Sequence, residues 1–214
     1  MNSDQIVATL EKFRIIPVIA IESAKDAVPL ADALLAGGLP VAEITFRTAA
    51  AAEVIAAMAK ARPNLLVGAG TVLTVENLQR AKECGAVFGV APGLNPKVVA
   101  RSAQLGMPFV PGVNNPTDIE AALDLGCKIL KFFPAGASGG TKMLAAMSAP
   151  YLHTGVRFVP TGGVNMDNLK EYLAVKSVLA VGGTWLATKE DIQQGRWDVI
   201  AENCRKALAV VGAV

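Results

Sequence analysis

The segment VFGVAPGLNPKVVARSAQLGMPFVPGVNNPTDIEAALDLGCKILKFFP, residues 87–134, decides the fold because it repeats one pattern. Short apolar runs rich in β-branched residues alternate with longer segments in which apolar residues recur at helical spacing. Within this segment the runs are 87–92, 108–113 and 129–134. The pattern continues outside it, in the runs 15–21, 41–46, 65–70, 157–162 and 178–183. We therefore expect eight strands, each followed by a helix.

The boundaries of the helical segments carry signals of their own. Asn95 and Asn115 each stand before a proline, which puts a capping side chain just ahead of a proline at the first helical position. Glycines close three helical segments immediately before the next run, namely Gly85, Gly106 and Gly126. Strands that are joined by helices and not by hairpin turns pair in parallel.

Two architectures fit such a chain, an open doubly wound sheet and a closed (β/α)₈ barrel. Near-continuous apolar strands indicate that both faces of the sheet are covered, which holds for either. Eight units at similar spacing favour the barrel, and GAGTV (68–72) lacks the third glycine of a dinucleotide-binding fingerprint. We predict an α/β protein with a single (β/α)₈ TIM-barrel domain over 1–214 and a short extra helix within 1–13.

Composition excludes several classes of function. The net charge of +2 without a dense Lys/Arg cluster argues against nucleic acid or an anionic membrane as a partner, and no apolar run is long enough to span a bilayer. Three widely separated cysteines fit reduced thiols in the cytoplasm, where we expect the protein to reside. The single histidine, His153, is interpreted as a surface residue and cannot build a zinc site of several imidazoles. If the protein is an enzyme, a carboxylate, a lysine or water moves its protons.

Lys131 lies inside the apolar run CKILKFFPAG (127–136), where burying an unpaired ammonium costs several kcal/mol. Either this strand is at an edge and the lysine reaches water, or the protein needs a nucleophilic amine there. Alternate side chains of a barrel strand face the interior, and functional residues gather at the carboxyl ends of the strands. Glu43, Thr45 and Arg47 share one face of the second predicted strand. If the charged faces point inward, Lys131 converges with Glu43, Arg47, Thr71 and Thr161.

Each of these charged residues has a plain interpretation and a catalytic one. Glu43 and Lys131 could form a buried ion pair that only fills the barrel. Alternatively, a carboxylate lies beside an amine whose neutral form is favoured by burial, which an imine-forming enzyme requires. Arg47 is either a solvated loop residue or a clamp on a substrate carboxylate.

Glycine pairs end the seventh and eighth runs, in PTGGVN (160–165) and VGGTWL (181–186). Many barrels bind phosphate at this place with backbone amides, although tight turns alone would also use glycine. The expected ligand thus has a carboxylate at one end, a carbonyl near Lys131 and a phosphate at the other end.

Six motifs now resemble one known family in order along nearly the whole chain. They are EITFRT (43–48), GAGTV (68–72), APGLN (91–95), KFFPA (131–135), PTGG (160–163) and GGTW (182–185). The chain resembles the bacterial 2-keto-3-deoxy-6-phosphogluconate (KDPG) aldolase / 4-hydroxy-2-oxoglutarate (KHG) aldolase family. The resemblance implies a class I aldolase that needs neither a metal nor a cofactor, has a (β/α)₈ barrel and assembles as a homotrimer.

The resemblance also implies roles for individual residues. Lys131 matches the Schiff-base lysine, Glu43 the general acid/base and Arg47 the ligand of the substrate carboxylate. Further matches are Thr71, Pro92 and Phe133 around the pyruvyl part, Thr161, Gly162 and Gly163 near the aldehyde part, and Gly182, Gly183 and Thr184 at the phosphate end. Phe46 and Thr184 depart from the leucine and serine of many members, and strand parity predicts that Phe46 points away from the site.

The implied reaction is cleavage of KDPG to pyruvate and glyceraldehyde 3-phosphate, with cleavage of KHG to pyruvate and glyoxylate beside it. The galactonate epimer of KDPG is an alternative substrate. A phosphate-binding barrel isomerase or synthase, with Lys131 as electrostatic support and no covalent adduct, is a second alternative. A barrel that serves only as a binding module is a third, but it would not need to retain Lys131 and Glu43.

Overall fold

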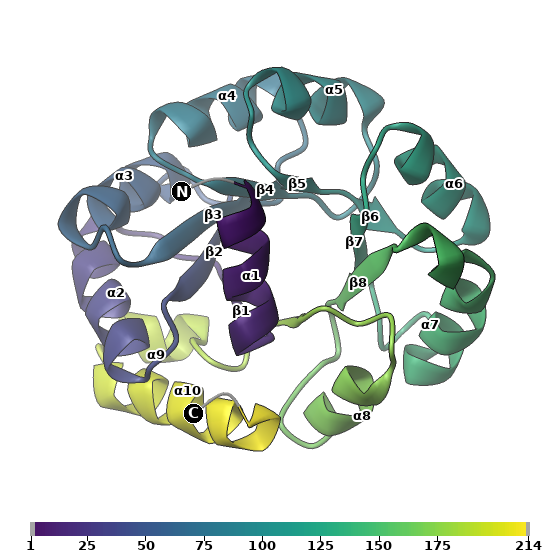
Figure 1. Ribbon diagram of the computed structural model, residues 1–214. Coiled ribbons are helices and arrows are strands. Elements are labelled where there is room, and N and C mark those ends of the chain that lie inside the picture. Colours follow the sequence, from purple (N-terminus) through teal and green to yellow (C-terminus); the bar gives the residue numbers. More distant parts are fainter. Residues whose placement is uncertain (1–2, 213–214) are drawn as a thin grey trace.

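A core of parallel strands surrounded by helices forms the protein (Figure 1). The computed structural model describes residues 3–212. Its strands are β1 (Ile15–Ile19), β2 (Val41–Thr45), β3 (Leu66–Gly70), β4 (Phe88–Val90), β5 (Phe109–Val110), β6 (Gly112–Val113), β7 (Ile129–Phe132), β8 (Arg157–Pro160) and β9 (Val181–Gly183). Every predicted run contains at least one of these strands, so the strand pattern of the sequence is confirmed.

Helices alternate with the strands as expected. They are α1 (Ser3–Phe13), α2 (Ala27–Ala36), α3 (Ala51–Ala61), α4 (Val75–Glu83), α5 (Pro96–Gln104), α6 (Pro116–Asp124), α7 (Gly140–Ser148), α8 (Leu169–Ala174), α9 (Lys189–Gln193) and α10 (Trp197–Val211), with 3₁₀ helices η1 (Ala24–Asp26) and η2 (Ala149–Thr154). His153 is exposed on η2, which confirms it as a surface residue.

The expected helix boundaries are confirmed by their geometry. The Asn95 side chain accepts a hydrogen bond from the Lys97 amide, and the Asn115 side chain accepts one from the Asp118 amide. The terminating glycines have φ angles of +97°, +58° and +80° at Gly85, Gly106 and Gly126. This left-handed conformation is one that glycine adopts without steric cost.

The strands form two parallel sheets instead of the expected single ring. One sheet has the order β5-β4-β3-β2-β1-β9, and the other has the order β6-β7-β8. Pro111 divides the fifth predicted strand into β5 and β6, because proline has no N–H to give to a ladder. On the other side, β8 meets the β9 segment only through two isolated bridges, Phe158 with Val178 and Thr161 with Gly182.

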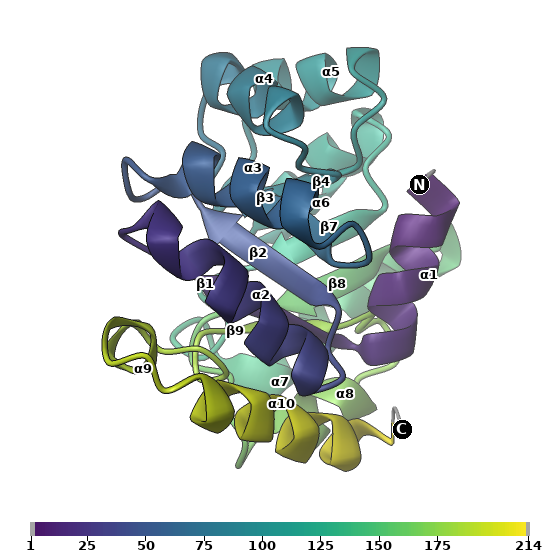
Figure 2. The same ribbon diagram turned by 90° about the vertical axis from the view of Figure 1, so that its left-hand side faces the viewer.

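Helix α1 covers the end of the sheets where the strands begin. Its Ile6 and Leu10 side chains are buried in the core. In Figure 1 α1 crosses the middle of the ring, and in Figure 2 the arrow of β2 points away from it. The predicted N-terminal helix is thus confirmed over Ser3–Phe13, whereas residues 1–2, like 213–214 at the other end of the predicted domain, lie outside the described residues.

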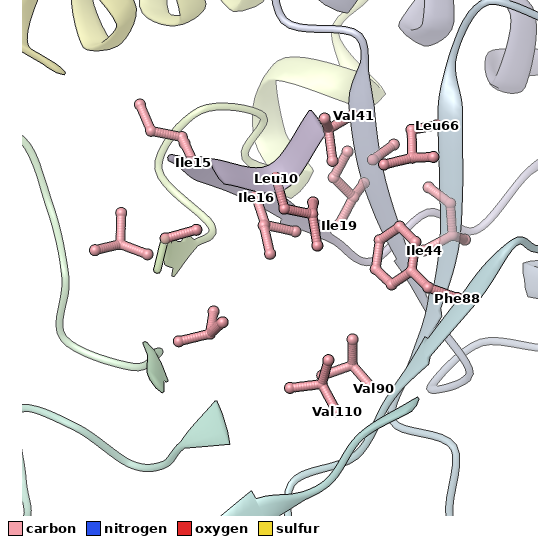
Figure 3. Close-up of a cluster of buried hydrophobic side chains, with 14 of the residues drawn as sticks. Leu10, Ile15, Ile16, Ile19, Val41, Ile44, Leu66, Phe88, Val90 and Val110 are labelled. Atoms are coloured by element: carbon pink, nitrogen blue, oxygen red, sulfur yellow. The ribbon is translucent and has the colours of Figure 1, made fainter. Parts of the chain in front are cut away.

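Branched side chains from the six-stranded sheet and from α1 fill the core (Figure 3). Phe88 lies where neighbouring Gly68 leaves room, since a Cβ atom at Gly68 would be 2.2 Å from the Phe88 ring. In residues 3–212, no helix has the length and apolar character that crossing a membrane requires.

Candidate active site

A cavity of about 290 Å³ opens at the carboxyl ends of the strands, opposite α1. Its walls are Val18, Thr45, Arg47, Thr71, Pro92, Lys131, Phe133, Thr161, Gly162, Gly163, Val164, Gly183 and Thr184. All predicted site residues except Glu43 and Gly182 therefore line one space. Two larger cavities, of about 480 and 540 Å³, have walls that include neither Lys131 nor Glu43. The candidate site is therefore identified by its charged residues and not by its volume.

Lys131, on the wall of this cavity, forms a buried pair with Glu43. The Lys131 Nζ lies 3.5 Å from the Glu43 Oε1, and the two residues are 5% and 2% exposed. Strand β7 is the middle strand of its sheet, so the interpretation of Lys131 as an edge-strand lysine that reaches water is wrong. An ion pair that only filled the core would be sealed by its neighbours, whereas Lys131 faces an open cavity.

The Glu43 carboxylate rests against a strand position without a side chain. A Cβ atom at Gly70 would lie 2.2 Å from Oε1 of Glu43. This role of Gly70 is not among the predictions from the sequence. The signal was present, because glycine inside a strand often marks the close approach of another group.

Phe133 forms the apolar wall next to the lysine. Its ring centroid lies 5.4 Å from the Lys131 Nζ, within the range of a cation–π contact. A Cβ atom at Gly162 would be 3.3 Å from the same ring, so the glycine turn packs closely on Phe133. An apolar group bound beside Lys131 would contact this ring.

Arg47 lies at the cavity mouth, two residues past the end of β2. The residue is exposed, and its Nε donates a hydrogen bond of 3.2 Å to the Thr45 Oγ1. Thr45 lines the cavity as well, and sequence reasoning placed it on the correct strand face without giving it a role. Phe46 is absent from the cavity wall and packs against the core, as strand parity predicted.

Thr71 has an unusual backbone. Its φ angle is +54°, in the left-handed region that β-branched residues rarely adopt. The Val72 amide, next in the chain, donates to the Val90 carbonyl at 3.0 Å and ties this turn to β4. Such strain is found mainly where the surrounding structure imposes a functional conformation.

The two glycine pairs have different places. Gly162 and Gly163, with φ angles of +89° and +81°, turn the chain after β8 and bare their backbone to the cavity. Gly183 and the exposed Thr184 face them. Gly182 lies behind Thr161 and leaves room for it, since a Cβ atom there would be 2.3 Å from the Thr161 Oγ1. Val18 and Val164 complete the wall and carried no polar signal in the sequence.

Comparison with known proteins adds independent information. The model of the family "KDPG and KHG aldolase" matches residues 6–203. The 2-dehydro-3-deoxy-phosphogluconate aldolase of Haemophilus influenzae is 46% identical over 210 residues, which cover 98% of each chain.

Two solved structures are also similar. KDPG aldolase from Legionella pneumophila, with pyruvate captured as a covalent carbinolamine, has a TM-score of 0.89 and 38% identity, covering 94% of this chain and 97% of its own. The 2-keto-3-deoxy-6-phosphogluconate aldolase of Zymomonas mobilis with 3-phosphoglycerate has a TM-score of 0.86 and 39% identity, covering 95% of each chain. With its buried lysine–carboxylate pair in a cavity at the strand ends, this chain belongs to the KDPG and KHG aldolase family.

Proposed function

We propose that the protein is a class I aldolase that cleaves KDPG to pyruvate and glyceraldehyde 3-phosphate, and KHG to pyruvate and glyoxylate. One observation carries the proposal: the buried amine of Lys131 lies 3.5 Å from the buried carboxylate of Glu43, and Lys131 faces an open cavity. Lysine amines form imines with carbonyl substrates once they are deprotonated, and a neighbouring carboxylate is the base that this step needs.

The first half of the proposed reaction forms the imine. Glu43 takes a proton from the Lys131 ammonium, and the free amine attacks the C2 carbonyl of the substrate. One proton moves from the attacking nitrogen to the oxygen to give the carbinolamine. The Glu43 carboxyl then gives its proton to this hydroxyl, water leaves, and an iminium joins Lys131 to C2. The short distance between the two groups lets one carboxylate serve each of these transfers.

The second half breaks the carbon–carbon bond. Glu43 removes the proton of the C4 hydroxyl, the C3–C4 bond cleaves, and its electrons move into the iminium to give an enamine. The aldehyde leaves, C3 is protonated, and water hydrolyses the imine to release pyruvate and restore Lys131. Each proton that Glu43 takes in this sequence has an acceptor in a later step.

The cavity offers matching contacts along the length of the substrate. Arg47 is assigned to the carboxylate, and the walls formed by Thr71, Pro92 and Phe133 to the pyruvyl carbons. Thr161, Gly162, Gly163, Gly183 and Thr184 are assigned to the aldehyde and its phosphate, with Gly182 supporting Thr161. The relatives that bind pyruvate and 3-phosphoglycerate support these assignments.

The finer architecture is also part of the proposal. We infer a single (β/α)₈ barrel domain in which β5 and β6 act as one strand. Consecutive residues of this segment pair with β4 on one side and with β7 on the other, and the two β8–β9 bridges lie where the ring would close. From family membership we propose a homotrimer. The three free cysteines fit the reducing cytoplasm, which we propose as its location.

Borohydride reduction in the presence of pyruvate, followed by intact-mass analysis and peptide mapping, tests the mechanism. One reduced pyruvyl group on Lys131, absent in Lys131→Ala, is the expected result. No adduct, or an adduct on another lysine, would contradict the proposal and favour the isomerase alternative. Turnover assays with KDPG and with its galactonate epimer then identify the preferred substrate.

A further inference from the structure

Thr45 forms hydrogen bonds with both Arg47 at the cavity mouth and the neighbouring strand β1. It is the last residue of β2 and is only 1% exposed, yet its side chain reaches the cavity wall. Its Oγ1 lies 3.0 Å from the carbonyl oxygen of Ile19 on β1 and 3.2 Å from the Nε of Arg47.

The direction of both hydrogen bonds follows from the groups involved. A guanidinium has five N–H donors and no acceptor, so Arg47 donates and the Thr45 oxygen accepts. The Ile19 carbonyl can only accept, so it takes the single hydroxyl proton of Thr45. The hydroxyl is thereby fixed with its lone pairs toward Arg47.

This arrangement restricts a side chain that would otherwise move freely. Arg47 is exposed, and a long arginine side chain loses considerable rotamer freedom when it is held for binding. With Nε occupied by Thr45, the two terminal nitrogens are left to grip a carboxylate as a fork. Much of the ordering is then complete before the substrate arrives, which favours binding.

We propose that Thr45 is a positioning residue that orients the Arg47 guanidinium for the carboxylate of the 2-keto acid. The inference rests on the proposed function, since it concerns how the same site recognises its substrate. It predicts an effect on binding of the carboxylate and not on the chemistry at Lys131.

Three single variants test this role. Thr45→Val keeps the shape and removes both hydrogen bonds, and we expect its KM for KDPG to rise about tenfold with kcat changed less than about twofold. Thr45→Ser restores the hydroxyl and should return KM to near the wild-type value. Thr48→Val is the matched control, because the Thr48 Oγ1 makes a similar 2.7 Å bond to the Ile21 carbonyl without binding Arg47 in the described hydrogen-bond network.

Two further measurements separate positioning from general damage to the fold. In Thr45→Val, the rate of imine trapping at subsaturating pyruvate should fall about tenfold more than the rate at subsaturating pyruvamide, which has no carboxylate. In an Arg47→Met background, Thr45→Val should have no additional effect on KM, because the two residues act through one contact. If Thr45→Val does not fold by circular dichroism, Thr45→Ala takes its place in both measurements.

Several results would overturn the inference. These are an unchanged KM in Thr45→Val, an equal loss with pyruvate and pyruvamide, a full additional loss in the Arg47→Met background, or the same KM change in Thr48→Val. Failure of the proposed function is distinguishable, because the wild-type protein would then trap no pyruvate on Lys131.

Discussion

The Glu43 carboxylate lies over the bare backbone of Gly70, and the proposed chemistry depends on that small space. A methyl group at this position would meet Oε1 at 2.2 Å, so Gly70→Ala must displace the carboxylate or shift β3. We expect kcat to fall at least about a hundredfold, the scale of a lost general acid/base, and stability to fall by about 1–3 kcal/mol. Steady-state kinetics and denaturant unfolding measure the two effects.

Gly93→Ala provides the matched control for Gly70→Ala. A Cβ atom at Gly93, which follows the cavity residue Pro92, would have no heavy atom within 4 Å. We therefore expect activity and stability close to wild type. Wild-type turnover in Gly70→Ala would show that activity does not depend on the present position of the Glu43 carboxylate.

The buried pair itself allows stability to be separated from catalysis. Replacing a buried ion pair with apolar residues of similar volume often leaves stability unchanged or raises it by about 1–4 kcal/mol, whereas removing one partner costs about 3–5 kcal/mol. We expect Lys131→Met to be destabilised and the double variant Lys131→Met/Glu43→Leu to recover at least wild-type stability. Both should be inactive.

Thermal unfolding of the single and double variants, together with turnover assays, checks this expectation. An active double variant would remove Lys131 and Glu43 from the mechanism. A double variant as unstable as Lys131→Met would mean that the pair supports the fold directly.

At the scale of single elements, the start of α6 depends on a reciprocal cap. The Asn115 Oδ1 accepts from the Asp118 amide at 3.0 Å, and the Asp118 Oδ2 accepts from the Asn114 amide at 2.8 Å. We expect Asn115→Ala to lower the free energy of unfolding by about 1–2 kcal/mol and to leave kcat/KM unchanged. Denaturant titration measures the loss, with Asn77→Ala inside α4 as the control variant. Equal losses in the two variants would contradict a capping role.

Much of the element pattern is predictable from the sequence because its signals are local. Asn115-Pro116 and Gly126 act on their own helix, and the apolar runs reveal their strands without knowledge of any partner. Strand pairing is not local. Pro111 in the run 108–113 marks a break in the ladder, but nothing in the run shows that the half before it pairs with β4 and the half after it with β7.

The same limit applies to the candidate site. Lys131, Glu43 and Arg47 stand out in the sequence because charged residues in apolar strands need an explanation. Gly70, Val18 and Val164 have no charge, and their places follow only from which side chains lie next to them in the folded protein. Thr45 was placed on the correct face, but its partner on β1 is set by register and not by pattern.

At the scale of the whole molecule, the packing of α10 on α2 makes the free energy of unfolding depend on pH in the alkaline range. Cys204 is fully buried in this contact. A Cβ atom added at Gly37 would lie 2.5 Å from the Cβ atom of Cys204. Burial raises the pKa of the Cys204 thiol from 9.0 to about 12. The unfolded chain loses the thiol proton near pH 9, whereas the folded chain keeps it to about pH 12.

Unfolding therefore releases a proton within this window, and the free energy of unfolding falls as the pH rises from about 9 to about 12. At pH 10 the loss from this group is about 1.4 kcal/mol. We expect denaturant unfolding at pH 8 and pH 10 to show a larger decrease for wild type than for Cys204→Ala, which lacks the thiol. Equal decreases would show that Cys204 does not keep its proton in the folded protein.

The helix α1 has a consequence for the order in which products leave. Because it covers the end where the strands begin, substrate, both products and the hydrolytic water all use the mouth at the other end. In the proposed function, the glycine turns hold the aldehyde product while the pyruvyl fragment is bonded to Lys131, and both groups line this one cavity. Departure of the aldehyde must then precede hydrolysis of the imine on Lys131. A high aldehyde concentration would keep the hydrolytic water out of the cavity and favour the reverse condensation of aldehyde with the pyruvyl fragment.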